Sequence, residues 1–497
     1  MNILLLSMPD SFEHMPEIVI RMPNGALTSL AGNLDSHHRV AVADLILVQR
    51  RVPETVDRLV RDIQPDVIGL SIMTFQRRTA LRIIDRIRSM RPQVRVVVGG
   101  YDPSLAPESY TGKTGVEFIV RGEGEITFRE LIRAFEKGSE DYAQIPGLSW
   151  RCGDEWIHNG ERGVSSLDGE QIRPPRREAR VLKGYAMLGR QVDVIETSRG
   201  CTFDCSFCSI IEMRGRNFHT YDLDRVIDDI RDAHKHGARS IFIVDDNITL
   251  NIHRFETLCR RIIEERLNNI DYIVQAMTSS IANHGDTLAP LMRQAGFRYV
   301  FLGIENILEK DLGFLRAKSK NEERNNGHIV GNATLKATDY IRKNKMMVVG
   351  GLIVGNPNDT PESIEANLEF AKHHVDWPYI QHPTPYPRTP MTQDLKDKNL
   401  ILHDRVEEYD GTTAVVRTDG MEPRQVEFMR WKAERSIKSR HIFSVFLHEP
   451  WFVIRNAHRM FGHTYRGCSV RTLLGLEDEN RAFEKYRELR NQERAYI

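Results

Sequence analysis

Three cysteines stand close together near the middle of the chain, at a C-x3-C-x2-C spacing: Cys201, Cys205 and Cys208. Three thiolates on one loop can each bind a different iron of a [4Fe–4S] cluster. The fourth iron then has no protein ligand, so a substrate or cosubstrate can coordinate there. Zinc is the alternative, but it usually takes four ligands in paired C-x2-C units, and the chain has no second pair. The spacing therefore favours an iron–sulfur site.

The residues around these cysteines suit a cluster. Gly200 lets the backbone turn tightly before the first thiolate. Phe203 and Phe207 can shield a cluster from water, which affects its potential. The other three cysteines are isolated along the chain, and we expect them to be structural: Cys152, Cys259 and Cys468.

The cysteine spacing, with Phe207 directly before the last cysteine, resembles the radical S-adenosylmethionine superfamily. The resemblance implies that the open iron binds the amino and carboxylate groups of S-adenosylmethionine. One electron, from a reducing protein such as flavodoxin or ferredoxin, then breaks the S–C5′ bond, and the 5′-deoxyadenosyl radical abstracts a hydrogen atom. The resemblance also implies a partial (β/α)6 barrel.

Three later segments resemble the S-adenosylmethionine site of that superfamily. They are Asp245-Asp246-Asn247, Gly303-Ile304-Glu305-Asn306 and the loop at 355–360. The resemblance places the first near the methionine amino group, the second near the ribose and the third near the adenine. Each segment alone is also typical of a turn followed by a helix cap. The residues expected to contact S-adenosylmethionine are Phe207, Asp245, Asp246, Gly303, Glu305, Gly355 and Asn356.

A series of alternating strands and helices must position these residues. Between residues 191 and 400, which we expect to form the barrel, helical stretches separate six apolar runs: 193–197, 240–244, 272–277, 299–303, 347–354 and 379–381. Such a barrel has its site at the carboxyl ends of the strands. The cysteine loop follows the first strand, so it lies at that end.

Residues 1–140 show a second alternating series. Strands are expected at 3–6, 40–43, 66–72, 94–98 and 118–120, with helices at 25–35, 52–63, 79–90 and 125–137. Continuous Val/Ile-rich strands between helices indicate a parallel sheet covered on both faces. The fold class is therefore α/β, with a doubly wound, Rossmann- or flavodoxin-like domain ahead of the barrel. Such domains bind ligands outside the carboxyl ends of their strands.

This arrangement resembles the cobalamin-binding subgroup of the superfamily over about residues 1–400. The segments that carry the resemblance are Val98-Gly99-Gly100-Tyr101-Asp102-Pro103, Arg121-Gly122-Glu123-Gly124-Glu125 and 385–390. Their glycines let backbone amides approach a macrocycle or its nucleotide tail. The alternative is a catalytically idle flavodoxin-like domain. The residues expected to contact cobalamin are Pro9, Ser71, Thr74, Gly99, Gly100, Tyr101, Gly122 and Glu123.

Two positions depart from what cobalamin proteins show. Asp232, His234 and Gly237 fit the D-x-H-x-x-G motif whose His binds cobalt elsewhere. Here the motif ends a barrel helix, and Gly237 is a natural helix cap, so we expect no cobalt ligand there. The lower face of cobalt would then be open to water or covered by the 71–76 loop. Arg388 stands where the family usually has Gly, which suggests that no positive φ is needed there.

The remaining segments are less regular. Residues 141–190 are polar and predict a linker with one hairpin. Residues 401–497 predict a mainly helical cap rich in aromatic residues, among them Phe428, Trp431 and Phe461. These aromatic side chains either form the core of a small helical domain or line an apolar substrate pocket.

Composition excludes some classes of function. Lys plus Arg equals Asp plus Glu at 69 each, so the chain lacks the basic surplus of a general nucleic-acid binder. The N-terminal apolar run is too short for a signal peptide, and no run has the length of a membrane span. We expect a cytoplasmic protein.

The combined features predict an enzyme with a [4Fe–4S] cluster, S-adenosylmethionine and cobalamin. Methylation of an unactivated carbon in a small, apolar or lipid-like substrate is the expected reaction. A relative that uses the same cofactors for a cyclisation or rearrangement is one alternative. A cobalamin sensor with a structural cluster is the other.

Overall fold

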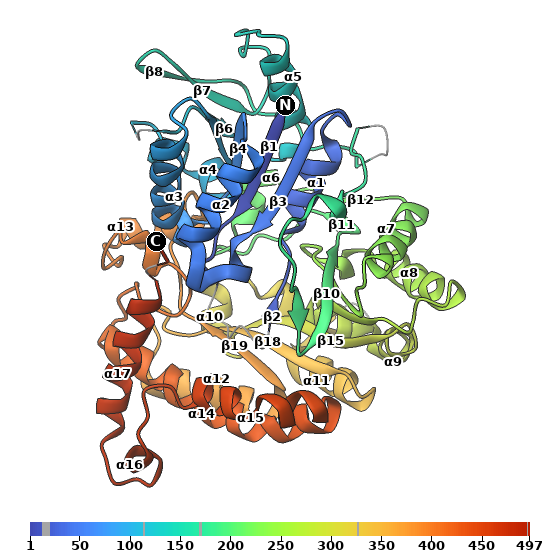
Figure 1. Cartoon of the computed structure of the whole chain (residues 1–497). Helices are drawn as coiled ribbons and strands as arrows, with labels where there is room; N and C mark the ends of the chain where they lie inside the picture. The colour runs from blue at the N-terminus through green and yellow to red at the C-terminus, as the bar shows by residue number, and fades with distance from the viewer. Residues whose placement is uncertain (12–19, 113–114, 168–170, 326–327, 495) are drawn as a thin grey trace.

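The computed structural model describes residues 1–11, 20–112, 115–167, 171–325, 328–494 and 496–497. Two sheets dominate the molecule (Figure 1). The blue N-terminal strands form one, and the green to orange strands form the other. The red C-terminal helices lie along the lower side of the second sheet in that view.

The N-terminal sheet has seven strands within the described residues, in the order β3-β1-β4-β5-β6-β7-β8. The first five pair in parallel: β1 (Asn2–Ser7), β3 (Arg39–Asp44), β4 (Val67–Ser71), β5 (Arg95–Gly99) and β6 (Phe118–Val120). Alternate residues of β1 point to opposite faces, since Leu4 and Leu6 join one hydrophobic cluster and Ile3 and Leu5 another.

Helices cover both faces of this sheet, as predicted for a doubly wound domain. α2 (Val52–Ile63) and α3 (Arg77–Met90) share a cluster with Leu4. α1 (Gly25–Asn33) and α5 (Gly124–Glu136) share one with Leu5. Residues at the carboxyl ends of β4, β5 and β6 line a cavity together with residues of α1 and α5.

The expected linker at 141–190 is more structured than its composition indicates. The predicted hairpin is present as β7 (Leu148–Cys152) and β8 (Glu155–His158), and it extends the N-terminal sheet with antiparallel strands. Arg177 is buried and pairs with Asp193 at 3.0 Å and Asp229 at 2.6 Å. The polar composition predicted a linker, but carboxylates of the barrel neutralise this arginine, which allows its burial.

The second sheet contains the six predicted barrel strands among the described residues. They are β10 (Arg190–Ile195), β13 (Ser240–Ile243), β14 (Asp271–Ala276), β15 (Phe297–Glu305), β18 (Met347–Ile353) and β19 (Trp377–Gln381), all parallel. Two short strands extend the β10 edge: β9 (Ala186–Met187) and β2 (Ile20–Arg21). β2 comes from the N-terminal region, so that region also contributes to the barrel sheet.

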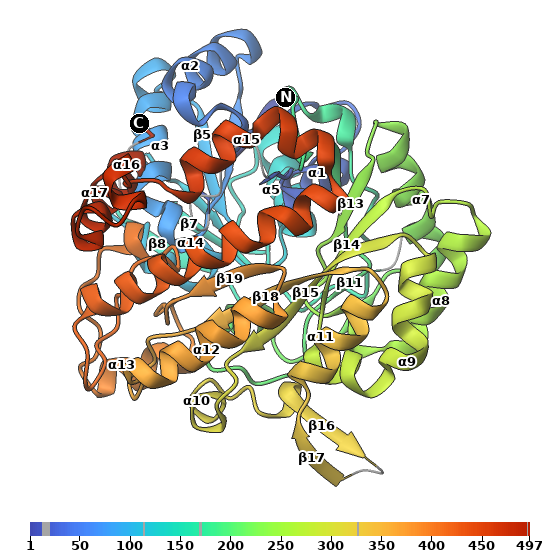
Figure 2. The ribbon, with the colours of Figure 1, turned by 90° about the horizontal axis from the view of Figure 1, so that it is seen from below.

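Helices follow the barrel strands and lie on their outer side (Figure 2). They are α7 (Leu223–Lys235), α8 (Ile252–Glu264), α9 (Thr278–Gln294), α11 (Thr334–Lys343) and α12 (Pro361–His374). Their buried faces join one large cluster with the strands, including Ile230, Leu258 and Met292. These helices do not cover the inner side of the sheet or the loops at its carboxyl end, where a ligand site can form.

The C-terminal region is helical, as expected: α14 (Pro423–His448), α15 (Pro450–Thr464), α16 (Val470–Leu473) and α17 (Glu479–Glu493). Phe428 and Trp431 pack with Phe483 in a cluster between α14 and α17. Phe428 and Trp431 therefore belong to a helical core, which is the first of the two alternatives, whereas Phe461 is exposed and lies outside it. No helix in the described part of the chain is both long and apolar enough to cross a membrane.

Candidate active site at two adjoining cavities

The three clustered cysteines face one cavity at the carboxyl ends of the barrel strands. Cys201, Cys205 and Cys208 lie between β11 (Ser198–Arg199) and α6 (Ser209–Arg214). All three line a cavity of about 250 Å³, together with Phe203 and Phe207. The loop thus brings three thiols and two aromatic rings to the same space, and the three thiols can bind three irons of a [4Fe–4S] cluster.

The turn before the first cysteine requires glycine. Gly200 has a φ of +91°, and a Cβ atom there would lie 2.4 Å from the Asn217 carbonyl oxygen. Its amide donates to Asp246 Oδ2 at 2.8 Å. The loop conformation is therefore held by a close backbone approach and by one carboxylate.

Burial affects the thiols of this loop. It raises the pKa of the Cys208 thiol to about 12, and it also raises the pKa of Cys205. Lys320 lowers the pKa of both thiols, against the effect of burial, because its positive charge favours a thiolate. A bound metal would displace these protons, since metal coordination deprotonates thiols.

The same cavity is lined by two strand-end residues that were named from the sequence. Gly303 and Glu305 end β15, at a shift in its register with β18. Glu305 has a φ of +59°, a conformation that costs energy in residues other than glycine. Its carboxylate pairs with Lys320 at 2.5 Å, and the Lys320 Nζ lies 5.8 Å from the centre of the Phe207 ring. The sequence offered no signal for Lys320, which comes from a turn after α10 (Glu309–Phe314).

The two aspartates after β13 take different positions. Asp246 lines the cluster cavity and accepts from Arg214 Nη1 at 3.0 Å. Asp245 is fully buried behind it and accepts from the Thr197 amide at 2.6 Å and the Ser198 hydroxyl at 2.6 Å. Burial raises the pKa of Asp245 to about 6. Its carboxylate is thus bound to the loop that precedes the cysteines.

Gly355 and Asn356 begin the loop after β18 and are both buried. Their amides donate to Asp359 Oδ2 at 2.8 Å each. Gly355 has a φ of +90°. Neither residue is in the wall of the cluster cavity as the structure describes it, but the Asn356 Oδ1 atom is buried without a hydrogen-bond partner among the described residues.

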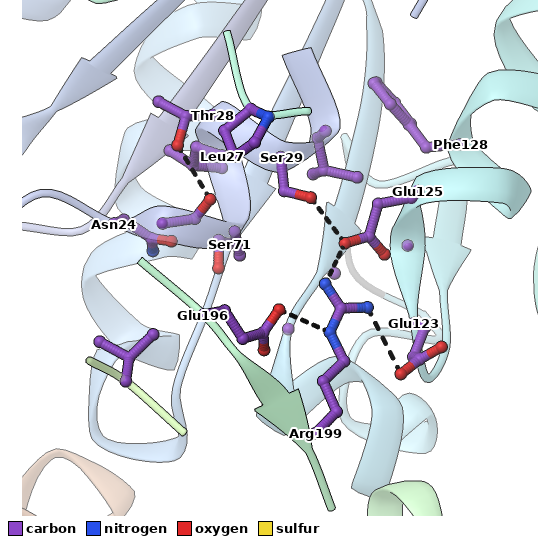
Figure 3. A pocket seen from close by; sticks show the side chains of 18 of the residues that line it. Asn24, Leu27, Thr28, Ser29, Ser71, Glu123, Glu125, Phe128, Glu196 and Arg199 are labelled. Carbon is purple, nitrogen blue, oxygen red and sulfur yellow. Dashed lines mark hydrogen bonds and ion pairs between the residues drawn. The ribbon is translucent and has the colours of Figure 1, made fainter. Parts of the chain in front are cut away.

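A second cavity, of about 380 Å³, lies between the carboxyl ends of β4, β5 and β6 and the first barrel strand β10 (Figure 3). Its lining includes six of the residues that were expected to contact cobalamin: Ser71, Gly99, Gly100, Tyr101, Gly122 and Glu123. The other two, Pro9 and Thr74, do not line this cavity as the structure describes it. The Pro9 carbonyl accepts from Gln49 at 2.6 Å, and Thr74 is buried.

The inner end of this cavity is apolar. Leu5, Leu27, Val97 and Phe128 line it between the sheet and the helices α1 and α5. Gly69 faces the same recess, where a Cβ atom would lie 2.8 Å from Leu5 Cδ2. The recess therefore has a shape and polarity that suit a flat apolar group.

The outer wall carries a buried cluster of charges, drawn in Figure 3. Arg199, from the barrel, lies 2.6 Å from Glu125 and 2.7 Å from Glu196, and its Nη1 atom is 3.4 Å from Glu123. Ser29 donates to Glu125 at 2.8 Å. Neither Arg199 nor Glu125 could be assigned to the site from the sequence, because only the fold brings them together.

Asp246 lines both cavities, so the two are neighbours across a thin wall. Arg214 pairs with Asp246 and also lines the second cavity. A group bound at the thiols and a group bound outside β4–β6 would therefore face each other across this pair. Proximity of this kind suits a reaction that uses two reactive centres on one substrate.

Comparison with known proteins agrees with this geometry. A family model described as "B12 binding domain" matches residues 18–132, and one described as "Radical SAM superfamily" matches residues 195–371. The chain belongs to the cobalamin-binding radical S-adenosylmethionine family.

Several curated members of the family are similar over most of this chain. An uncharacterized methyltransferase of Pyrococcus horikoshii is 27% identical and covers 92% of this chain and 97% of its own length. An anaerobic magnesium-protoporphyrin IX monomethyl ester cyclase of Synechocystis sp. is 30% identical over 64% of each chain. Bacteriochlorophyllide d C-8(2)-methyltransferase of Chlorobaculum tepidum is 24% identical over 82% of each.

Solved structures of two family members share the fold. The cobalamin-dependent S-adenosylmethionine radical enzyme OxsB, with aqua-cobalamin bound, superposes with a TM-score of 0.67 at 17% identity and covers 100% of this chain and 76% of its own. The methyltransferase TsrM of Kitasatospora setae, with cobalamin and a [4Fe–4S] cluster bound, gives 0.64 at 20% identity, over 80% and 75% of the two chains. The predicted fold class is therefore confirmed.

Two sequence positions can now be compared with the family's patterns. Gly237 has a φ of +97° and follows the end of α7, and His234 Nδ1 contacts the Ala238 carbonyl at 3.0 Å, as expected for a helix end. The expectation for Arg388 was wrong, since its φ is +62°. The loop keeps the left-handed turn that glycine would adopt freely, and Arg388 adopts it at a cost in energy.

Proposed function

We propose that this protein holds a [4Fe–4S] cluster with S-adenosylmethionine in the first cavity and cobalamin in the second, and that it methylates an unactivated carbon of a small apolar molecule. The observation that carries the proposal is the shared wall: Asp246 lines both cavities. Methyltransferases among the relatives support methyl transfer as the reaction.

Each cofactor has a fitting set of residues. Cys201, Cys205 and Cys208 would bind the cluster, and Gly303 and Glu305 lie where S-adenosylmethionine would extend from it. When bound, the cluster and S-adenosylmethionine supply a radical that abstracts hydrogen, and cobalamin supplies a methyl group. A reducing protein such as flavodoxin or ferredoxin would provide the electron.

The second cavity offers separate surfaces for the two ends of cobalamin. The glycines after β5 and β6 leave space for a macrocycle at the outer end. The apolar recess between Leu5 and Phe128 would take the nucleotide tail. Ser71, Ile72 and Met73 of the 71–76 loop also line this cavity, so this loop would lie against the bound macrocycle.

The chain's own residues would orient the reactants and exclude water. Phe203 and Phe207 line the cluster cavity beside the thiols and shield it. Lys320 and Glu305 add a paired cation and anion to the same lining, where they can orient polar groups of S-adenosylmethionine. A dry cavity protects radicals from side reactions.

Relatives named as cyclases favour a second candidate function. The same cofactors would then serve a ring-forming reaction without methylation. The mass of the product separates the two, because methylation adds one CH2 group. In the third case, a cobalamin sensor with a structural cluster, the reduced protein would form no 5′-deoxyadenosine.

Anaerobic reconstitution with iron, sulfide, cobalamin and labelled S-adenosylmethionine tests the proposal. The reduced parent protein should release 5′-deoxyadenosine, and Cys205→Ala should release none. Cys152→Ala is the matched control, because Cys152 is exposed on β7. Equal release by Cys205→Ala and the parent would refute the cluster assignment. A purified protein that retains no corrinoid would refute the assignment of the second cavity and leave the first intact.

A further inference from the structure

The C-terminal helices carry apolar side chains on their surface that the proposed reaction does not use. In α15, Trp451, Ile454 and Phe461 are 71%, 57% and 52% exposed. Their spacing of three and seven residues places them on one side of the helix. Phe452 and Val453 lie on its other side and are buried with Tyr185 and Met187 of the β9 region. The helix therefore packs on the molecule with one apolar face and presents a second one to the outside.

A second group of exposed apolar residues follows in and after α16. Val470, Leu474 and Leu476 are each at least 65% exposed. α15 and α16 both lie on the lower side of the molecule in Figure 1, and α15 lies at the front when the molecule is seen from below in Figure 2. We call these six residues of α15 and the α16 region the C-terminal apolar surface.

Charge distinguishes this surface from the rest of the chain. The segment 450–476 contains four arginines and no aspartate or glutamate, whereas the whole chain has 69 basic and 69 acidic residues. Arg455 and Arg459 are exposed on α15. They follow Ile454 by one and five positions, so they lie along one border of its apolar stripe. The acidic residues that flank the segment are Glu449 and Glu477.

We propose that the C-terminal apolar surface docks on an anionic lipid bilayer, with α15 lying in the plane of the interface. An interfacial helix combines an apolar face that contains aromatic residues with basic residues beside it. The arginine stems can lie along acyl chains while the guanidinium groups reach lipid phosphates. A second copy of this chain is a poorer partner, because symmetric contact would bring the arginines of the two copies together. Docking does not depend on the proposed reaction, although it would bring the enzyme to apolar substrates.

Sedimentation of the full-length protein with vesicles tests this proposal. The protein should bind vesicles of phosphatidylcholine and phosphatidylglycerol, bind phosphatidylcholine alone at least about tenfold more weakly, and dissociate as salt screens the charges. The double variants Trp451→Ser/Phe461→Ser and Arg455→Glu/Arg459→Glu should each reduce binding by about tenfold or more.

Matched controls change similar residues elsewhere. Ile329→Ser/Val330→Ser removes apolar side chains that are 59% and 56% exposed on β17 (His328–Asn332), and Arg39→Glu/Arg61→Glu makes the same charge change on the N-terminal domain. Both should bind vesicles like the parent. The proposal fails if the parent does not bind anionic vesicles, or if the controls lose as much binding as the α15 variants. It also fails if light scattering shows a dimer that Trp451→Ser/Phe461→Ser dissociates, because a second copy would then cover this surface.

Discussion

Glu305 and Lys320 form an ion pair inside the cluster cavity, and neither side chain has much contact with solvent. Their side chains are 10% and 14% exposed. Although burial opposes the charged form of Lys320, the negative charge of Glu305 and its hydrogen bond stabilise it and raise its pKa. The pair keeps two charges in a cavity that must otherwise exclude water, so each partner depends on the other.

Replacing Lys320 with Met should therefore destabilise the protein, because it leaves the Glu305 carboxylate buried without its partner. The expected loss is about 3 kcal/mol in the free energy of unfolding, measured by chemical denaturation. The double variant Lys320→Met/Glu305→Gln should lose less than the sum of the two single variants.

Lys318→Met is the matched control, since Lys318 pairs with Glu309 at the surface, where both side chains are at least half exposed. It should change the free energy of unfolding by less than about 1 kcal/mol. Equal losses in the free energy of unfolding for the Lys318 and Lys320 variants would show that the burial of the Lys320–Glu305 pair has no energetic consequence.

The turn from β5 into α4 (Tyr101–Leu105) shapes the outer end of the second cavity. Gly100 has a φ of +98°, and a Cβ atom there would lie 2.9 Å from both the amide nitrogen and the carbonyl oxygen of Ile72. The turn after β5 thus packs directly on the turn after β4. At this scale, one glycine sets how closely two strand ends approach each other.

Gly100→Ala should separate these two turns. We expect a loss of about 1–3 kcal/mol in the free energy of unfolding from backbone strain alone, together with reduced retention of cobalamin, measured by absorbance after gel filtration. Gly160→Ala is the control, because Gly160 has no heavy atom near its Cβ position and no positive φ. Retention equal to that of the parent would contradict the placement of cobalamin beside Gly100.

At the scale of the whole molecule, buried charges join the N-terminal domain to the barrel. Arg199 lies in the short strand β11, just before the cysteine loop of the barrel, whereas Glu125 lies in the first turn of α5 and Ser29 lies in α1. Burial would raise the pKa of Glu125, but the charge of Arg199 and its hydrogen bond outweigh burial and lower it to about 2. The interface therefore stabilises the ionised form of this carboxyl.

This pKa predicts how stability depends on pH. Because the pKa of Glu125 is lower in the folded protein than its ordinary value of 4.5, its contribution is present above about pH 4.5 and is lost as the pH falls towards about 2. Glu125→Gln should lower the free energy of unfolding at neutral pH by up to about 3 kcal/mol, and the difference from the parent should shrink through that window.

Denaturation of both proteins at a series of pH values measures this difference. Glu140→Gln, at an exposed position just beyond α5, should follow the parent throughout. A difference between Glu125→Gln and the parent that stays constant from neutral pH to about pH 2 would contradict the assigned role of Arg199.

Local patterns in the sequence explain which parts of the fold and of the candidate site could be predicted. Runs such as those of β4 and β15 alternate with helical stretches, and these patterns depend only on neighbouring residues, so both sheets were found from the sequence. Cys201, Cys205 and Cys208 were found for the same reason, because one short loop contains all three thiolates. The strand-end glycines Gly99, Gly100 and Gly303 were named from motifs that resemble the family, and their positions agree with the rule that parallel strands place their sites at the carboxyl end.

Contacts between distant segments could not be predicted in this way. Lys320 reaches the cluster cavity from a turn, Arg177 is buried by carboxylates of the barrel, and β2 pairs with β9 across the two domains. Arg388 adopts a positive φ although its side chain disfavours it. The sequence by itself determined the two α/β units and the three thiolates, because periodicity and spacing are local. Only the tertiary structure decided that Asp246 divides two cavities and that Arg199 joins the domains, because those contacts depend on where the two sheets meet.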